Sequence, residues 1–156
     1  MRICVFGAGA VGGHLAAKFA AGGHEVSVVA RGANLQGIQA NGIALREGAR
    51  TIAGRVRASD RAADLGAQDV VFVTTKATAL AAFAAAAAPL AGAARASNTV
   101  FVFVQNGIPW WYAMGLSASR PPPPALARLD PGGALARAIA PERVIGAVVY
   151  LSLIHI

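Results

Sequence analysis

Three glycines near the N-terminus have the spacing of a phosphate-binding turn, in the segment Gly7-Ala8-Gly9-Ala10-Val11-Gly12. In such a turn the first glycine permits a tight bend. The second lets a pyrophosphate approach the backbone, and the third lets a helix pack closely against a strand. The N-terminus of the following helix offers N–H groups and a partial positive charge to the phosphates. The spacing therefore predicts a dinucleotide site, although a glycine-rich loop without a ligand shows the same pattern.

An arginine follows the predicted second strand of this unit. Residues 25–30 are expected to form that strand, and Arg31 and Gly32 follow it without an acidic residue. An NAD-specific unit carries Asp or Glu here to hold the ribose 2′-hydroxyl, whereas a guanidinium pairs with a 2′-phosphate. We therefore predict NADPH or NADP as the cofactor, the alternative being that Arg31 is a solvated surface residue.

Two further polar residues follow predicted buried strands. Lys76 comes after residues 69–74, where its ammonium could contact the cofactor or an anionic substrate. A plain surface lysine is disfavoured there by the positive end of the next helix. Asn106 comes after residues 99–104, and its amide could bond a ribose or a substrate oxygen, unless Asn106-Gly107 is only a turn.

Other reactive side chains give weaker signals. The histidines at positions 14, 24 and 155 lack metal-ligand spacing and an acidic cluster, so we expect no metal. Cys4 is the single cysteine, lies in an apolar run and is expected to be buried and inert. The aromatic residues at 110–112 could line a pocket or meet a partner, and burial in a core or interface is the commoner outcome.

Apolar runs and glycine stops predict the elements that position these residues. We expect strands at 2–6, 25–30, 69–74, 99–104 and 143–151, and helices at 10–21, 34–41, 76–88, 109–116 and 133–140. An antiparallel pair at 43–46 and 51–58, a helical turn at 61–65 and a polyproline loop at 121–124 complete the set. Alternating strands and helices predict a Rossmann-type α/β fold, doubly wound around a mostly parallel sheet. Its strand ends would gather Gly7, Lys76 and Asn106 at one edge.

Composition limits the remaining function classes. The chain has 156 residues, 56% of them hydrophobic, which fits one packed domain. Its net charge of +7 comes from scattered arginines, so an anionic cofactor explains the excess better than nucleic acid does. No apolar run has the length of a membrane span or the form of a signal peptide, so we expect a cytoplasmic protein without a membrane partner.

Together these segments resemble the ketopantoate reductases (2-dehydropantoate 2-reductases). The resemblance rests on residues 2–12, 71–77, 104–108 and 144–146, in order and at compatible spacing. It implies an oxidoreductase that uses NADPH to reduce a 2-oxo acid, 2-dehydropantoate, to pantoate in pantothenate biosynthesis. It also implies that residues 7–12 hold the phosphates, Arg31 the 2′-phosphate, Lys76 the cofactor, and Asn106 the nicotinamide and substrate. Position 79 is an alanine here, whereas some members of the family have a polar residue there that contacts the cofactor.

The resemblance also implies a second, helical domain that carries the general acid. We expect residues 1–150 to be the NADP-binding domain, and 151–156 to be an anomalous tail of a chain truncated before that helical domain. Such a chain would bind NADP(H) and turn over little or nothing. Two alternatives stay open: another NADP-dependent dehydrogenase of 2-oxo or 3-hydroxy acids, and a non-catalytic nucleotide-sensing module.

Overall fold

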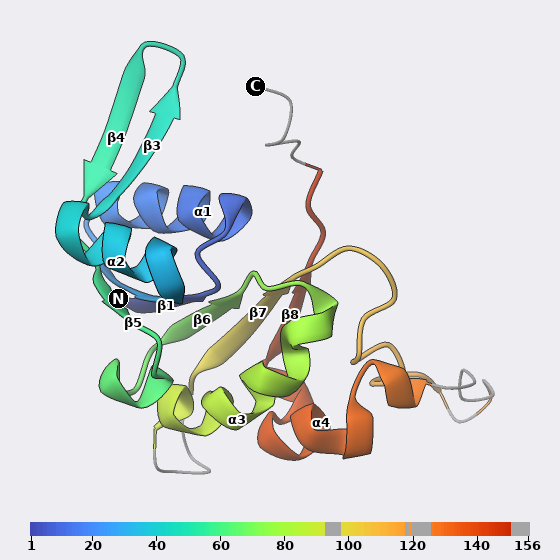
Figure 1. The fold of residues 1–156 in the computed structure, drawn as a ribbon. Helices are drawn as coiled ribbons and strands as arrows, with labels where there is room; N and C mark the ends of the chain where they lie inside the picture. Colours follow the sequence, from blue (N-terminus) through green and yellow to red (C-terminus); the bar gives the residue numbers. More distant parts are fainter. Residues whose placement is uncertain (93–97, 118, 120–125, 151–156) are drawn as a thin grey trace.

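A six-stranded parallel sheet forms the centre of the protein in the computed structural model, which describes residues 1–92, 98–117, 119 and 126–150 (Figure 1). The strands of this sheet are β1 (Arg2–Phe6), β2 (Glu25–Val29), β5 (Arg57–Ser59), β6 (Val70–Val73), β7 (Val100–Val104) and β8 (Val144–Ala147). Their order across the sheet is β5-β2-β1-β6-β7-β8, and every neighbouring pair is parallel. The predicted doubly wound α/β fold is confirmed.

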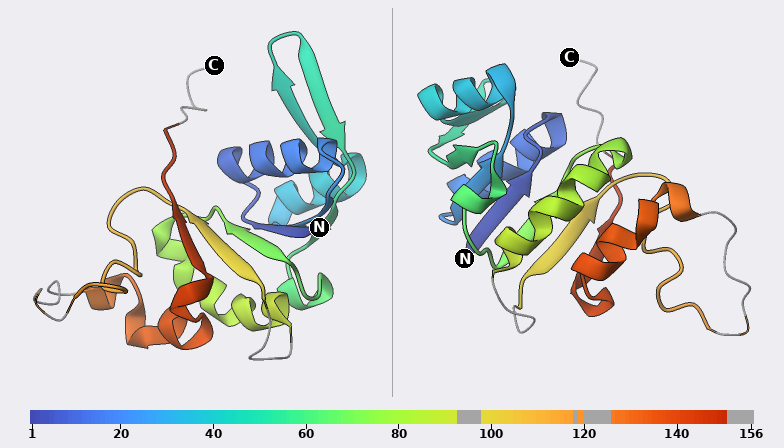
Figure 2. Two further views of the ribbon diagram at one scale, coloured as in Figure 1. Left: turned by 180° about the vertical axis from the view of Figure 1, so that it is seen from behind. Right: turned by 60° about the horizontal axis from the view of Figure 1, so that its bottom comes forward.

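Helices cover the sheet from both sides. They are α1 (Ala10–Ala21), α2 (Gly32–Asn41), α3 (Leu80–Ala91) and α4 (Ala134–Ala138), with short 3₁₀ turns at Ala62–Asp64, Ala77–Ala79, Leu126–Arg128, Pro131–Gly133 and Pro141–Arg143. The helices α1 and α2 lie on one side of the sheet, and α3 and α4 lie on the other (Figures 1 and 2). A hairpin of β3 (Ile43–Glu47) and β4 (Arg50–Gly54) projects beyond α1.

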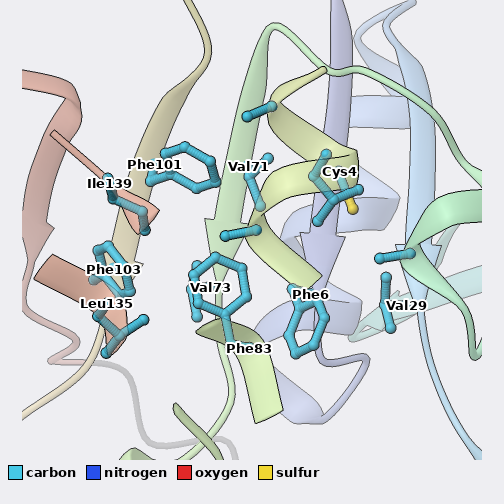
Figure 3. Packing of buried hydrophobic residues seen from close by; sticks show 14 of the residues in the cluster. Cys4, Phe6, Val29, Val71, Val73, Phe83, Phe101, Phe103, Leu135 and Ile139 are labelled. Carbon is cyan, nitrogen blue, oxygen red and sulfur yellow. The ribbon is translucent and has the colours of Figure 1, made fainter. Parts of the chain in front are cut away.

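The alternation of side chains along the strands divides the core into two layers. Cys4 and Phe6 of β1 face α3, and Val5 between them faces α1. On the α3 side, Phe83 makes edge-on contacts with Phe6 and with Phe103, at centroid distances of 5.0 and 5.7 Å (Figure 3). The opposite layer contains small and β-branched residues, which let α1 approach the sheet.

The prediction for the second strand of the hairpin is wrong at its C-terminal end. Residues 51–58 were expected to form a single strand, but β4 ends at Gly54 and residues 57–59 form β5. The backbone N–H of Ala30 donates to the carbonyl of Ser59 at 3.1 Å, which ties β5 to the end of β2. At the turn away from the hairpin, a Cβ on Gly54 would lie 2.8 Å from the Cβ of Ala20, so only glycine lets the chain pass α1.

The helix expected at 76–88 begins later and ends later. It starts at Leu80 after a 3₁₀ turn and continues through Pro89 to Ala91. Pro89 has no N–H to donate to the carbonyl four residues earlier, so the last turn of the helix loses one hydrogen bond. Leu90 is fully buried, and burying a leucine contributes about 1.5–3 kcal/mol, enough to offset the lost bond.

The helix expected at 109–116 is absent, and consecutive turns take its place. The N–H of Tyr112 donates to the carbonyl of Pro109 at 3.1 Å, which is a turn and not an α-helical bond. Trp110 and Trp111 both pack on Phe103, with centroids 5.4 and 5.1 Å away. Adjacent residues of an α-helix point about 100° apart, so a helix could not place both rings on the same phenyl group.

Three other elements differ from the predictions by two or more residues at one end. The last strand, expected at 143–151, spans only 144–147, and the last helix, expected at 133–140, spans 134–138. The helix expected at 34–41 begins two residues earlier, at Gly32. The polyproline loop at 121–124 and the tail at 151–156 lie outside the described residues.

Candidate functional site: a cleft at the carboxyl edge of the sheet

The glycine turn is built by close contacts between β1, α1 and the loop after β6. Gly7 has a φ of +108°, which favours glycine, and its N–H donates to the carbonyl of Val29 at 3.0 Å. A Cβ on Gly7 would lie 2.7 Å from the Cγ2 of Thr75. The hydroxyl of Thr74 donates to the carbonyl of Gly7 at 2.6 Å. The turn is therefore fixed against the end of β6.

The other two glycines of the turn meet opposite surroundings. A Cβ on Gly12 would lie 2.0 Å from the carbonyl oxygen of Gly7, so no side chain fits there. A Cβ on Gly9 would meet nothing within 4 Å. Gly12 thus lets α1 pack against the turn, while Gly9 leaves open space above the first residues of the helix.

Helix α1 begins at this turn without a neutralising side chain. Gly9 is its N-cap, and the first turn contains no acidic residue. The first N–H groups of a helix have no partner within the helix and carry a partial positive charge. The arrangement suits an anion.

A first hollow, of about 170 Å³, lies between the glycine turn and the end of β2. Arg31 stands at its rim as the exposed N-cap of α2. The amide nitrogen of Asn34 donates to the carbonyl of Ala8 at 2.6 Å, which holds α2 to the turn. Ala79, at the position where some members of the family have a polar residue, also lines this hollow.

A second hollow, of about 330 Å³, lies between the loops after β6 and β7. It is lined by Val11, Thr74, Thr75, Lys76, Ala77, Val104, Gln105, Asn106 and Val149. Lys76 is exposed and is the only ionisable side chain in this lining. Among the described residues no carboxylate lines either hollow, so Arg31 and Lys76 give the cleft a positive charge at both ends.

Thr75 is the residue that the two hollows share. Its carbonyl accepts a bond from the side-chain nitrogen of Gln105 at 2.8 Å. Its hydroxyl oxygen is buried and has no hydrogen-bond partner among the described residues. Such a group is costly to leave unpaired, so it marks a place where a ligand would supply the partner.

Asn106 does not point freely into the second hollow. Its amide nitrogen donates to the carbonyl of Val149 at 3.0 Å, and its amide oxygen accepts the N–H of Val149 at 2.9 Å. The expected contact of this amide with cofactor or substrate must use the hydrogen-bonding capacity that remains. The partner lies 43 residues away, and nothing in the sequence around Asn106 indicates it.

The remaining predicted residues lie outside this cleft or play structural parts. Cys4 is fully buried, and burial raises the pKa of its thiol to about 12, as expected for an inert cysteine. Lys18 of α1 is exposed and pairs with Glu47 of the hairpin at 2.5 Å, and this contact lowers the pKa of Glu47. Asn34 and the hydroxyl of Thr74 are site residues that the sequence analysis did not single out.

Other classes of site find no support within the described residues. No three of the His, Cys, Asp and Glu side chains there gather closely enough to hold a metal ion. The helices there are all too short or too polar to cross a bilayer.

Comparison with known proteins identifies the family. Residues 3–110 match the family described as ketopantoate reductase PanE/ApbA. The chain belongs to this family. The family match includes the glycine turn, Arg31, Lys76 and Asn106.

Individual relatives agree with this assignment. A 2-dehydropantoate 2-reductase from Mesorhizobium japonicum is 48% identical over 155 residues. A ketopantoate-reductase structure from Ralstonia solanacearum MolK2 is 45% identical, with a TM-score of 0.82 over 97% of this chain. A PanE/ApbA family ketopantoate reductase from Ralstonia eutropha JMP134 is 25% identical, with a TM-score of 0.67 over 97% of this chain. The chain spans 45% of the length of the first relative, 45% of the second and 42% of the third.

Proposed function

We propose that this chain binds NADPH in the cleft and serves as the cofactor-binding part of a 2-dehydropantoate 2-reductase. The observation that carries the proposal is the pair of hollows joined at Thr75, with the glycine turn between a guanidinium at one end and an ammonium and an amide at the other. The groups of NADPH follow the same order, with the 2′-phosphate at the adenosine end, the pyrophosphate in the middle and the nicotinamide at the other end. Its phosphates would lie over residues 7–12, where Gly9 leaves open space.

The first hollow would hold the adenosine half. Arg31 lies at its rim, so its guanidinium would pair with the 2′-phosphate that distinguishes NADPH from NADH. Asn34 keeps the start of α2 against the turn and thereby places Arg31. The apolar wall of Ala79 and Ala82 offers a flat surface for the adenine ring.

The second hollow would hold the nicotinamide half and the 2-oxo acid. The bound cofactor supplies the hydride that reduces the ketone. Lys76 would attract the carboxylate of the substrate or a phosphate of the cofactor, and Asn106 would donate to an oxygen atom with its second amide N–H. Protonation of the resulting alkoxide requires a general acid, and the family resemblance assigns that group to the helical domain and not to Lys76.

Cofactor preference tests the first part of the proposal. Arg31→Ala should weaken NADPH binding roughly 10- to 100-fold while NADH binding changes little, because a charge-assisted pair contributes about 1.5–3 kcal/mol. Arg46→Ala, which removes an exposed arginine from the β3–β4 hairpin, is the matched control and should leave both affinities unchanged. Fluorescence titration of NADPH and NADH measures the ratio. An unchanged ratio in Arg31→Ala would contradict the assignment.

Activity of the chain is tested separately. We expect the 156-residue chain to bind NADPH without measurable oxidation of NADPH by 2-dehydropantoate. Steady reduction of 2-dehydropantoate by this chain would show that it contains the whole reaction centre.

A further inference from the structure

The side chain of Asn106 extends the pairing of β7 and β8 by one step. The backbone N–H of Gln105 donates to the carbonyl of Ala147 at 3.1 Å, which is the last backbone hydrogen bond between these two strands. One residue further, the amide of Asn106 exchanges two bonds with the backbone of Val149, at 2.9 and 3.0 Å. A side-chain amide has the same donor and acceptor as a peptide group, so Asn106 takes the place of the next backbone rung.

This pair of bonds holds a stretch that has little other support. After β8 the chain continues as an extended segment past the end of the sheet (Figure 1). Val148 and Tyr150 are 64% and 96% exposed, whereas Val149 between them is half-buried and lines the second hollow. Within the described residues, the two bonds to Asn106 are the hydrogen bonds that hold residues 148–150 to the domain.

The neighbouring amide secures the opposite wall of the same hollow. The side chain of Gln105 donates to the carbonyl of Thr75, in the loop that carries Lys76. Gln105 and Asn106 therefore bind in opposite directions, one to the loop after β6 and the other to the chain after β8. The two amides together set the width of the hollow.

The bonds to Val149 leave half of the Asn106 amide available. An asparagine side chain has two N–H donors and an oxygen with two lone pairs. Val149 takes one donor and one lone pair. The remaining donor and lone pair belong to an amide whose orientation is already fixed, on a residue that lines the hollow.

We infer that Asn106 is a positioning residue that fixes the chain after β8 as a wall of the second hollow, and that a ligand filling this hollow tightens its hold on Val149. The coupling rests on the proposed function, since the ligand is the nicotinamide half of NADPH. Contact with a bound ligand restricts Asn106, and a restricted amide keeps its bonds to Val149 closed for a larger fraction of the time. The position of residues 148–150 thus depends on occupation of the hollow.

We call the two hydrogen bonds between Asn106 and Val149 the clasp. Hydrogen exchange at the Val149 amide tests whether the clasp exists. We expect Asn106→Ala to speed this exchange about tenfold, the size expected for loss of one well-formed bond. Asn106→Asp keeps the acceptor for the Val149 N–H and should have a smaller effect. Asn98→Ala, at the exposed opposite end of β7, is the matched control and should leave Val149 unchanged. Unchanged exchange at Val102 within β7 would show that the variants are folded.

The coupling is tested by adding ligand to the unaltered chain. NADPH should slow exchange at Val149, whereas 2′-phospho-ADP-ribose, which lacks the nicotinamide, should not. Equal exchange at Val149 in the unaltered chain and in Asn106→Ala would overturn the clasp. NADPH binding without slower exchange at Val149 would overturn the coupling. If NADPH does not bind at all, the proposed function and the coupling both fail, while the comparison of variants still decides the clasp.

Discussion

Replacing Gly12 by alanine places one methyl group where α1 meets the glycine turn. The new Cβ would lie 2.0 Å from the carbonyl oxygen of Gly7 and 2.5 Å from the hydroxyl of Thr74. Real Cβ atoms do not approach other atoms closer than 3.0 Å, so the helix and the turn must separate by about 1 Å. The hydroxyl of Thr74 can rotate away, but the carbonyl is fixed by β1. The separation therefore disturbs the phosphate site directly.

The size of the effect follows from two opposing contributions. Overpacking costs about 3 kcal/mol at the upper end of its usual range, because the obstacle is backbone. Alanine in place of glycine in a helix stabilises the folded state by about 1 kcal/mol. The net loss of about 2 kcal/mol lowers the melting temperature of a domain of this size by roughly 4–8 °C. Displacement of the helix N-terminus should also weaken NADPH binding about tenfold.

The next residue provides the control for this experiment. A Cβ on Gly13 would meet nothing within 4 Å, so Gly13→Ala has the same chemistry without the clash. It should raise the melting temperature by about 2–4 °C through helix propensity alone. Thermal unfolding followed by circular dichroism compares the two variants. If Gly12→Ala melts at the same temperature as Gly13→Ala, the contact between α1 and the turn is not the constraint described here.

Three further outcomes follow from other contacts. Gly146→Ala should lower the free energy of unfolding by about 1–3 kcal/mol in urea titrations, because its Cβ would lie 2.9 Å from the ring of Trp111. Bonds from Arg2 lower the pKa of Asp69, so its contribution to stability is present above the unfolded pKa and is lost as pH falls through the folded pKa. The difference in stability between Asp69→Asn and the unaltered chain should therefore vanish in acid. The buried Cys4 should resist thiol reagents at pH 8 until urea unfolds the protein.

Much of the fold could be predicted from sequence because glycines separate its first elements. The strand at residues 2–6 and the helix at 10–21 match their predicted bounds, since an apolar run ends at Gly7 and an alanine-rich run ends at Gly22. Strands β6 and β7 were also recognised, because valine and phenylalanine runs of that length suit a strand buried on both faces.

The errors occur where distant contacts override the local pattern. Residues 57–59 continue the pattern of the hairpin, yet pairing with β2 draws them into the main sheet. Pro109 has the position of a proline in the first turn of a helix, yet the rings of Trp110 and Trp111 both pack on Phe103. Similarly, the sequence placed Asn106 at the correct edge but could not reveal its bonds to Val149, because these join elements 43 residues apart.

The order of the strands also governs how the chain assembles during synthesis. Strand β1 lies between β2 and β6. Its partner β2 follows within 30 residues of the N-terminus, but Arg2 contacts Asp69, 67 residues later, at the other edge of β1. Until residues 70–73 are made, the edge of β1 that pairs with β6 has no partner, and its four apolar residues Ile3 to Phe6 are not covered from that side, which favours aggregation of nascent chains. The strand at the centre of the sheet is thus made first and receives its second partner late, so we expect the yield of this domain to depend on how well β1 is protected while β6 is being made.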